Sequence, residues 1–157
     1  MKKRICLFVI FALCTFSCSN RQYIKYEKED VAENKIAVYF YTSVGSDSCP
    51  GTYYFQQLLN DQNTGINFSF SNYRIPECRF CCFLCDREQY EFIIKFENVQ
   101  ATGQGSTTQA YSQSFKLNLK DEKSSHVFIL CAIPESRLLV YRVDPAVGEK
   151  KIGNCMR

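Results

Sequence analysis

The segment YEFIIKFENV, residues 90–99, alternates apolar and polar side chains. On an extended chain one side carries four large apolar residues, Tyr90, Phe92, Ile94 and Phe96. The other side carries the charged residues Glu91, Lys95 and Glu97. A period of two residues is the pattern of a β-strand that buries one face and exposes the other. The segment therefore predicts a strand in a sheet with one buried and one solvated face.

The same pattern recurs along the chain. GINFSFS (65–71) places Asn67 and Ser69 on the solvated side of a strand. The dense apolar run KIAVYFYTSV (35–44) predicts a strand that is covered on both faces. Further strands are predicted at 114–120, 126–133 and 137–143, with a tight hairpin at Pro134-Glu135-Ser136. About six strands separated by turn signals predict a mainly β fold, an antiparallel β-sandwich or barrel.

Two segments are expected to differ from this pattern. TYYFQQLLNDQ (52–62) places Phe55, Leu58 and Leu59 at helical spacing, which predicts one short helix. QATGQGSTTQAYSQ (100–113) is polar and contains glycine, so it is expected to form a long surface loop that is either mobile or used for binding.

The first 17 residues have the build of a signal peptide. A cationic start (Lys2, Lys3, Arg4) precedes an apolar run that is too short to span a bilayer comfortably, and small residues follow. Residues 18–34 are polar and predict a tether. Residues 35–157 are expected to form a single β-rich domain, since about 140 residues are enough for one core.

Two ways of processing this leader remain open. Small residues at Thr15 and Ser17 allow cleavage before Cys18, and Ser17 with Ser19 allow cleavage after Ser19. Alternatively, TFSC-SN resembles the end of a bacterial lipoprotein signal, with Thr15 in place of the usual leucine. That resemblance implies a lipid on Cys18 and contact with a membrane through this anchor alone. Both alternatives predict an exported protein, either secreted or held at the cell surface or envelope.

Removal of the leader makes the chain electrically neutral. Three of the 19 basic residues leave with it, so 16 basic residues face 16 acidic ones. A neutral chain without basic runs lacks the charge that nucleic-acid binding requires. Nucleic acid is therefore not expected as a partner, which leaves a protein or a small ligand.

Cysteine is unusually frequent, with 10 in the chain. Exported proteins meet oxidising surroundings, in which cysteines normally form disulfides. The disulfide candidates are Cys49, Cys78, Cys81, Cys82, Cys85, Cys131 and Cys155. If Cys18 is retained without lipid, the number of cysteines is even, and if it is lipidated or removed one thiol is left over.

The stretch CRFCCFLC (78–85) allows sharper hypotheses. Structural zinc sites normally take two C-x-x-C pairs from separated stretches, whereas Cys81 and Cys82 are adjacent here, so no metal or other cofactor is expected. A redox C-x-x-C normally begins a helix after a strand, a pattern that these flanks lack. A thiol–disulfide redox protein remains an alternative function. The preferred interpretation is a connection between strands whose cysteines are cross-linked to other parts of the chain.

No set of catalytic residues is evident, and a non-enzymatic protein is expected. His126 is the only histidine, and it is predicted to be a polar residue at the start of a strand. Asn67-Phe68-Ser69 is an N-glycosylation acceptor if the source is eukaryotic. Five tyrosines are candidates for a ligand surface: Tyr39, Tyr41, Tyr53, Tyr54 and Tyr111.

The sequence thus predicts an exported, disulfide-stabilised β-domain that acts as a binding or structural module. A second alternative comes from the stretch Cys49 to Tyr54, whose Gly51-Thr52-Tyr53 is similar to the Gly-x-Trp that opens lipocalins. That resemblance implies a barrel that carries a small apolar ligand.

Overall fold

The computed structural model of the chain describes residues 28, 30–42, 50–72 and 78–155. The described residues form eight strands and two helical segments. The strands are β1 (Lys35–Thr42), β2 (Gly51–Leu59), β3 (Gln62–Asn72), β4 (Phe80–Asp86), β5 (Gln89–Thr102), β6 (Gly105–Asn118), β7 (His126–Ala132) and β8 (Leu139–Val143). The helical segments are the 3-10 helix η1 (Pro134–Ser136) and the α-helix α2 (Pro145–Ile152).

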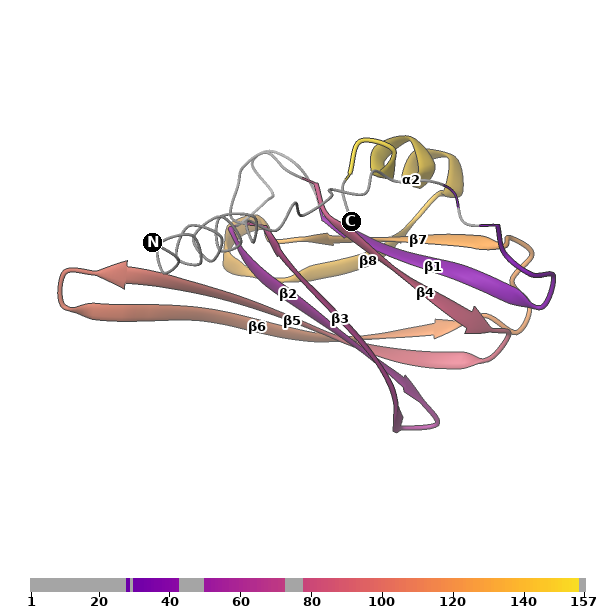
Figure 1. The fold of residues 1–157 in the computed structure, drawn as a ribbon, viewed down its shortest axis with the longest axis horizontal. Helices are drawn as coiled ribbons and strands as arrows, with labels where there is room; N and C mark the ends of the chain where they lie inside the picture. The colour runs from indigo at the N-terminus through magenta and orange to yellow at the C-terminus, as the bar shows by residue number, and fades with distance from the viewer. Residues whose placement is uncertain (1–27, 29, 43–49, 73–77, 156–157) are drawn as a thin grey trace, which may run out of the picture.

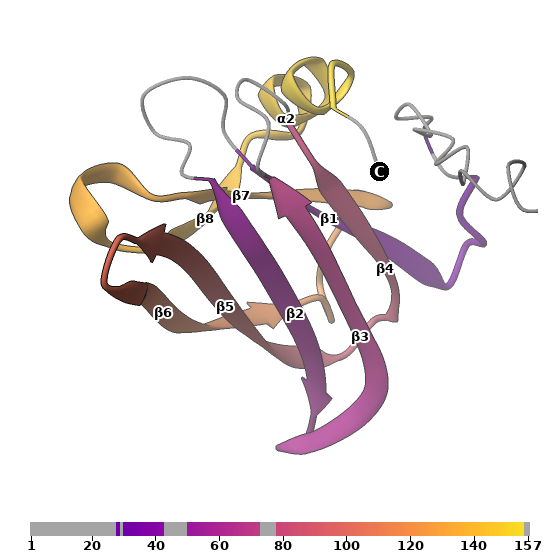
Figure 2. The same cartoon turned by 60° about the vertical axis from the view of Figure 1, so that its left-hand side comes forward.

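The described strands are divided between two sheets. One sheet has the order β4-β1-β7-β8, and the other has the order β3-β2-β5-β6. Strands β1 and β7 pair in parallel, and the other described pairs are antiparallel. The two sheets lie face to face as layers (Figures 1 and 2). The prediction of a mainly β fold is confirmed, and the architecture is a sandwich.

The inter-sheet core is built from the apolar positions of the period-two pattern. Phe40 of β1 lies at its centre, with ring centroids 5.3 Å from Phe55, 5.7 Å from Phe83 and 4.9 Å from Phe92. Because these rings come from both sheets and lie in contact, they fill the space between the layers. Tyr90, Phe92, Ile94 and Phe96 all face this core, as predicted.

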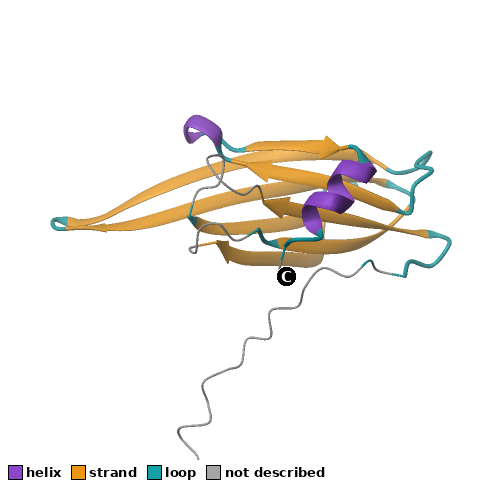
Figure 3. Cartoon of the chain, turned by 90° about the horizontal axis from the view of Figure 1, so that it is seen from above, coloured by secondary structure: helices purple, strands orange, loops and turns teal. Residues whose placement is uncertain are grey.

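A second core covers the opposite face of the sheet that contains β1. Helix α2 lies over this face, as Figure 3 shows from above. This helix-side core consists of Ala37, Tyr39, Tyr41, Cys78, Phe80, Cys82, Phe128, Leu130, Ile152 and Cys155. It explains why β1 is buried on both faces, as the run of apolar residues predicts. The Asp144 side chain caps the helix by accepting from the backbone N–H of Ala146 at 3.0 Å.

Part of the predicted tether contacts this region. Val31 packs against the helix-side core, and Lys28 forms an ion pair with Glu149 of α2 at 3.1 Å. The predicted leader (1–17) and Cys18 lie outside the described residues.

The helix predicted at 52–62 is wrong, because this segment forms β2 and the turn after it. Tyr53, Phe55 and Gln57 point into the sandwich at period two, and this burial outweighs the helical spacing of the leucines. The strand ends where Asn60 and Asp61 adopt positive φ angles of 51° and 59°. These two residues form the turn between Leu59 and Gln62, which pair with each other.

The surface loop predicted at 100–113 is also wrong. The pairing of β5 with β6 continues without interruption from Gln89↔Asn118 to Thr102↔Gly105. The resulting hairpin projects beyond the rest of the sandwich (Figure 1). Its outer part carries small polar residues that are exposed on both faces, so no alternation of apolar and polar residues marks it as a strand.

The connection predicted around CRFCCFLC is wrong as well. Residues 80–86 form β4, an edge strand that pairs with β1. The first part of β4, from Phe80 to Phe83, is buried on both faces, so this stretch is apolar and lacks a period of two, whereas Leu84 and Asp86 are exposed. With β2 and β4 added, the described strands number eight rather than six. The other predicted strands are confirmed within a few residues of their ends, except that β6 begins well before 114, and the hairpin at 134–136 contains η1.

Candidate functional site

The cysteines of CRFCCFLC are distributed over the two faces of β4. Cys81 and Cys85 belong to the inter-sheet core, whereas Cys78 and Cys82 belong to the helix-side core. Residues three apart in an extended chain point to opposite faces. Each C-x-x-C pair is therefore split between the two cores, and neither pair has its sulfurs on one side of the strand. This geometry counts against both a redox dithiol and a site that pinches one metal ion.

Cys78 forms a disulfide with Cys155, across a sequence separation of 77 residues. Their Cα atoms are 4.5 Å apart. The bridge connects the residue just before β4 with the segment that follows α2, so it fixes the helix against the sheet. Two disulfide candidates are thus joined. Cys49 lies outside the described residues.

The other candidates, Cys81, Cys82, Cys85 and Cys131, are buried thiols. Burial, with a smaller contribution from the charge of Cys82, raises the pKa of Cys85 to about 12. Burial also raises the pKa of Cys131. Because the thiolate is the reactive form, these two side chains behave as apolar packing groups. That each of them forms a disulfide stays a prediction.

Cys85 also takes part in a small polar network around the buried side chain of Gln57. The Gln57 side-chain amide donates from Nε2 to Cys85 Sγ at 3.1 Å, and Thr64 Oγ1 donates to Gln57 Oε1 at 2.9 Å. Gln57 lies on β2 and Cys85 on β4, so the network links the two sheets. It satisfies a buried amide and has no exposed reactive group, which makes it a structural feature.

His126 is the first residue of β7. Its Nδ1 lies 2.8 Å from Ser125 Oγ, and its ring stacks on Tyr39 with centroids 6.1 Å apart. This placement agrees with the predicted polar residue at the start of a strand. In the described part of the chain, no three His, Cys, Asp or Glu side chains converge as metal ligands would.

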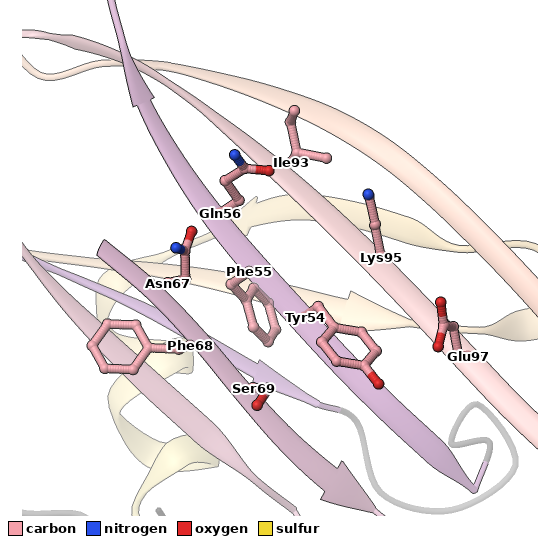
Figure 4. Close-up of a pocket in the computed structure, with 9 residues that line it drawn as sticks. All are labelled: Tyr54, Phe55, Gln56, Asn67, Phe68, Ser69, Ile93, Lys95 and Glu97. Atoms are coloured by element: carbon pink, nitrogen blue, oxygen red, sulfur yellow. The ribbon is translucent and has the colours of Figure 1, made fainter. Parts of the chain in front are cut away.

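A hollow of ≈ 470 Å³ lies on the outer face of the sheet formed by β3, β2 and β5. Figure 4 shows its lining residues, with Tyr54 between side chains of the two neighbouring strands. The lining consists of Tyr54, Phe55, Gln56, Asn67, Phe68, Ser69, Ile93, Lys95 and Glu97. Phe55 and Phe68 pack into the inter-sheet core. The other seven side chains point outward and form what we call the outer hollow.

Strand register brings these outward side chains together. Tyr54 of β2 is paired with Ser69 of β3 on one side and with Lys95 of β5 on the other. Gln56 is likewise paired with Asn67 and Ile93. Paired residues on one face of a sheet have Cβ atoms roughly 5 Å apart, so these groups border a common surface.

The polar groups of the outer hollow differ from those beside it. Next to the hollow, near the start of β2, Thr52 Oγ1 and Ser71 Oγ are hydrogen-bonded at 3.0 Å. On its other side, near the start of β5, the Ser114 hydroxyl donates to the Glu91 carboxylate. By contrast, the side chains of Gln56, Asn67, Ser69, Lys95 and Glu97 form no hydrogen bond or ion pair with any described residue. Their donors and acceptors are available to a ligand.

The structure separates the five candidate tyrosines. Tyr39, Tyr41 and Tyr53 are buried in the two cores. Tyr111 is half-buried and stacks on Phe96 with ring centroids 6.0 Å apart. Tyr54 alone of the five lies in the outer hollow, where it is 40% exposed.

The glycosylation candidate Asn67 lies in the same hollow and is exposed, as its predicted outward position requires. The alternation of apolar and polar residues also predicts the outward positions of Ser69, Lys95 and Glu97, but it does not reveal the site itself. The reason is β2, which lies between the two flanking strands and was predicted as a helix. Without β2 between them, the sequence does not predict that the strands 65–71 and 90–99 belong to the same part of one sheet.

No protein-family model, curated protein or solved structure matches the chain. None of the helices in the described residues is long and apolar enough to cross a bilayer.

Proposed function

We propose that this chain is an exported β-sandwich that acts as a non-enzymatic binding or structural module at or outside the cell surface. Its leader, residues 1–17, directs export and is removed. In a bacterial source Cys18 carries a lipid, and residues 18–34 hold the domain away from the membrane. Without that lipid the mature protein is secreted.

The observation that carries this proposal is the disulfide between Cys78 and Cys155. Disulfides form and persist in oxidising compartments, and they are rare in the reducing cytosol. The bridge closes a loop with a sequence separation of 77 residues and fixes α2 on the sheet, so it has a structural purpose. A leader of the signal-peptide type supports the same compartment independently.

Two alternatives receive less support. A carrier for a small apolar ligand needs a cavity inside a barrel, whereas the rings of Phe40, Phe55 and Phe92 fill the interior of this sandwich.

A thiol–disulfide enzyme needs two sulfurs that can meet. Within each C-x-x-C pair of 78–85, the two cysteines point to opposite faces of the strand. In addition, the pKa of Cys85 is raised to about 12. The outer hollow instead supports recognition of a ligand at the surface.

Intact-mass and peptide mass spectrometry of the natively exported protein tests this proposal. We expect the mature chain to begin at or just after Cys18 and the peptides that contain Cys78 and Cys155 to be linked. Any lipid should be on Cys18 and should disappear in a Cys18→Ala variant, whereas a Cys14→Ala variant, changed within the removed leader, should keep it. A protein found inside the cell with its leader intact and both cysteines reduced would contradict the proposal.

A further inference from the structure

We propose that the outer hollow is a binding site for a neutral carbohydrate, with Tyr54 as the stacking platform and Gln56, Asn67 and Ser69 as hydrogen-bonding groups. The proposal deepens the function proposed above, because it names the ligand class of a binding module. It follows from the aromatic group, the amides and the charge of this surface.

Tyr54 provides a flat apolar surface, and the other outward side chains of the hollow are polar or charged except for Ile93. It is 40% exposed and lies on the central strand of the three that form the hollow. Aromatic rings with one polar end are common in recognition sites, because they combine a large apolar face with a hydrogen-bonding tip. A pyranose ring has an apolar face of C–H groups that can stack on such a ring, while its hydroxyl groups point outward to polar neighbours.

The amides and hydroxyls around Tyr54 match those hydroxyl groups. Gln56 and Asn67 are opposite each other in the register, and each amide has both a donor and an acceptor. Ser69, opposite Tyr54, adds a group of the same kind. Neighbouring strands are about 4.8 Å apart, and alternate residues along a strand are roughly 7 Å apart. The four side chains thus border an area on the scale of a single sugar ring.

These groups are not used within the protein. The side chains of Gln56, Asn67 and Ser69 have no hydrogen-bond partner among the described residues, whereas the polar pair Thr52–Ser71 beside the hollow is satisfied internally. A volume of ≈ 470 Å³ lies within the roughly 300–1,000 Å³ of small-molecule sites.

The charge of the outer hollow determines which ligand class fits it. Lys95 and Glu97 are the charged residues of its lining, and their charges cancel. Phosphorylated and nucleic-acid ligands are usually bound by several cations, and a single lysine beside a carboxylate does not provide them. An apolar ligand would leave the surrounding amides desolvated without partners. A ligand that is neutral, rich in hydroxyls and apolar on one face fits the cancelling charges, the amides and the ring of Tyr54.

Titration calorimetry of the mature protein with cellohexaose, maltohexaose, mannohexaose and a galactan oligosaccharide tests the proposal. We expect at least one of these neutral probes to bind. Tyr54→Ala should weaken that binding by about tenfold or more, which corresponds to about 1.4 kcal/mol. Tyr54→Phe keeps the ring and should retain most of the affinity. The double variant Gln56→Ala with Asn67→Ala should also bind more weakly.

Tyr141→Ala is the matched control. Tyr141 is 47% exposed on β8 of the other sheet, so its removal should leave the affinity unchanged. Thermal unfolding of each variant shows whether it is folded, and the Phe variant preserves the test if Tyr54→Ala is not. Heparin serves as a polyanionic probe and should bind more weakly than the neutral sugar.

Three results would overturn the carbohydrate site: no binding to any neutral probe, binding that Tyr54→Ala leaves intact, or preferential binding of heparin that depends on Lys95. A glycan found on Asn67 of the native protein would also overturn it, because the chain's own sugar would cover the hollow. The three binding results do not bear on the compartment, and a glycan on Asn67 would agree with export from a eukaryotic cell. The proposed export is therefore judged separately, by its own mass measurement.

Discussion

At the residue scale, Gly148 shows how closely α2 packs on its sheet. A Cβ atom added at this position would lie 2.5 Å from Cβ of Phe128 on β7. Cβ of Phe128 is attached directly to the backbone, so a rotamer change cannot move it away. A glycine in the middle of a short helix costs roughly 1 kcal/mol relative to alanine. Here that cost is offset because the absence of a side chain lets the helix lie directly on the strand.

Gly148→Ala is therefore expected to lower the free energy of unfolding. Overpacking costs about 1–3 kcal/mol, and the steric conflict with Cβ of Phe128, which a rotamer change cannot move, places this site at the upper end. Even after the gain in helix propensity, a net loss of about 1–2 kcal/mol should remain. Urea unfolding followed by circular dichroism measures it.

Gly103→Ala is the matched control, since no atom lies within 4 Å of a Cβ built at that position. It should change the free energy of unfolding by less than about 0.5 kcal/mol. Equal stabilities for the two alanine variants would show that α2 is not packed against Phe128 as described.

At the element scale, the hairpin of β2 and β3 depends on its turn. Asn60 and Asp61 both have positive φ, which is the geometry of the turn that best matches the twist of two paired strands. Asn tolerates this region well, and the usual residue at the second position is glycine. Replacement of Asp61 by glycine would therefore give the Asn-Gly pair, which most strongly favours a hairpin.

We expect Asp61→Gly to raise the free energy of unfolding by about 0.5–1 kcal/mol. Positive φ costs an L-residue roughly 1–2 kcal/mol, and the greater freedom of glycine in the unfolded chain cancels part of that gain. Asp61→Ala should have the opposite sign, because alanine lacks the local hydrogen bonds through which Asp tolerates this region. Thermal melts of both variants measure these shifts. Stabilisation by alanine and destabilisation by glycine would mean that residues 60–61 do not form this turn.

At the scale of the whole molecule, the described residues are stabilised by two stacked cores and by the cross-link Cys78–Cys155 between distant segments. The inter-sheet core holds the two layers together, and the helix-side core attaches α2 to the outer face of one layer. The disulfide Cys78–Cys155 connects the start of β4 with the end of the described chain. It therefore restrains the helix-side core and leaves the outer hollow, which lies on the other sheet, unaffected.

Loss of this bridge should destabilise the fold without changing the hollow. For a sequence separation of 77 residues, restriction of the unfolded chain contributes about 4.5 kcal/mol in the loop-entropy account. We expect dithiothreitol to lower the urea midpoint of the wild-type protein, and the double variant Cys78→Ala with Cys155→Ala to have a similarly low midpoint. Dithiothreitol should lower the midpoint of that variant by less than it lowers the midpoint of the wild-type protein. An unchanged wild-type midpoint under reduction would contradict a structural role for the bridge.

The sequence predicts well the strands that have either a clear period of two, such as β5, or a dense run of β-branched and aromatic residues, such as β1. In β5 the alternation of Tyr90, Phe92, Ile94 and Phe96 with polar residues leaves a strong period of two, and the predicted strand is present. In β4 the residues from Phe80 to Phe83 are buried on both faces, so the period disappears there and the cysteines resemble a functional motif. The outer half of the hairpin of β5 and β6 was not predicted as strand for the opposite reason, because both its faces are exposed and no apolar residues mark a period of two.

The sequence by itself determined that this protein is mainly β and which positions along its clearest strands face inward. These properties depend on local period and composition, which neighbouring residues fix. Only the tertiary structure decided that β2 is a strand, that Cys78 pairs with Cys155 while its neighbours are buried on opposite faces, and that Tyr54 meets Asn67 and Lys95 in one hollow. Those outcomes depend on contacts between segments far apart in the chain, which no local pattern specifies.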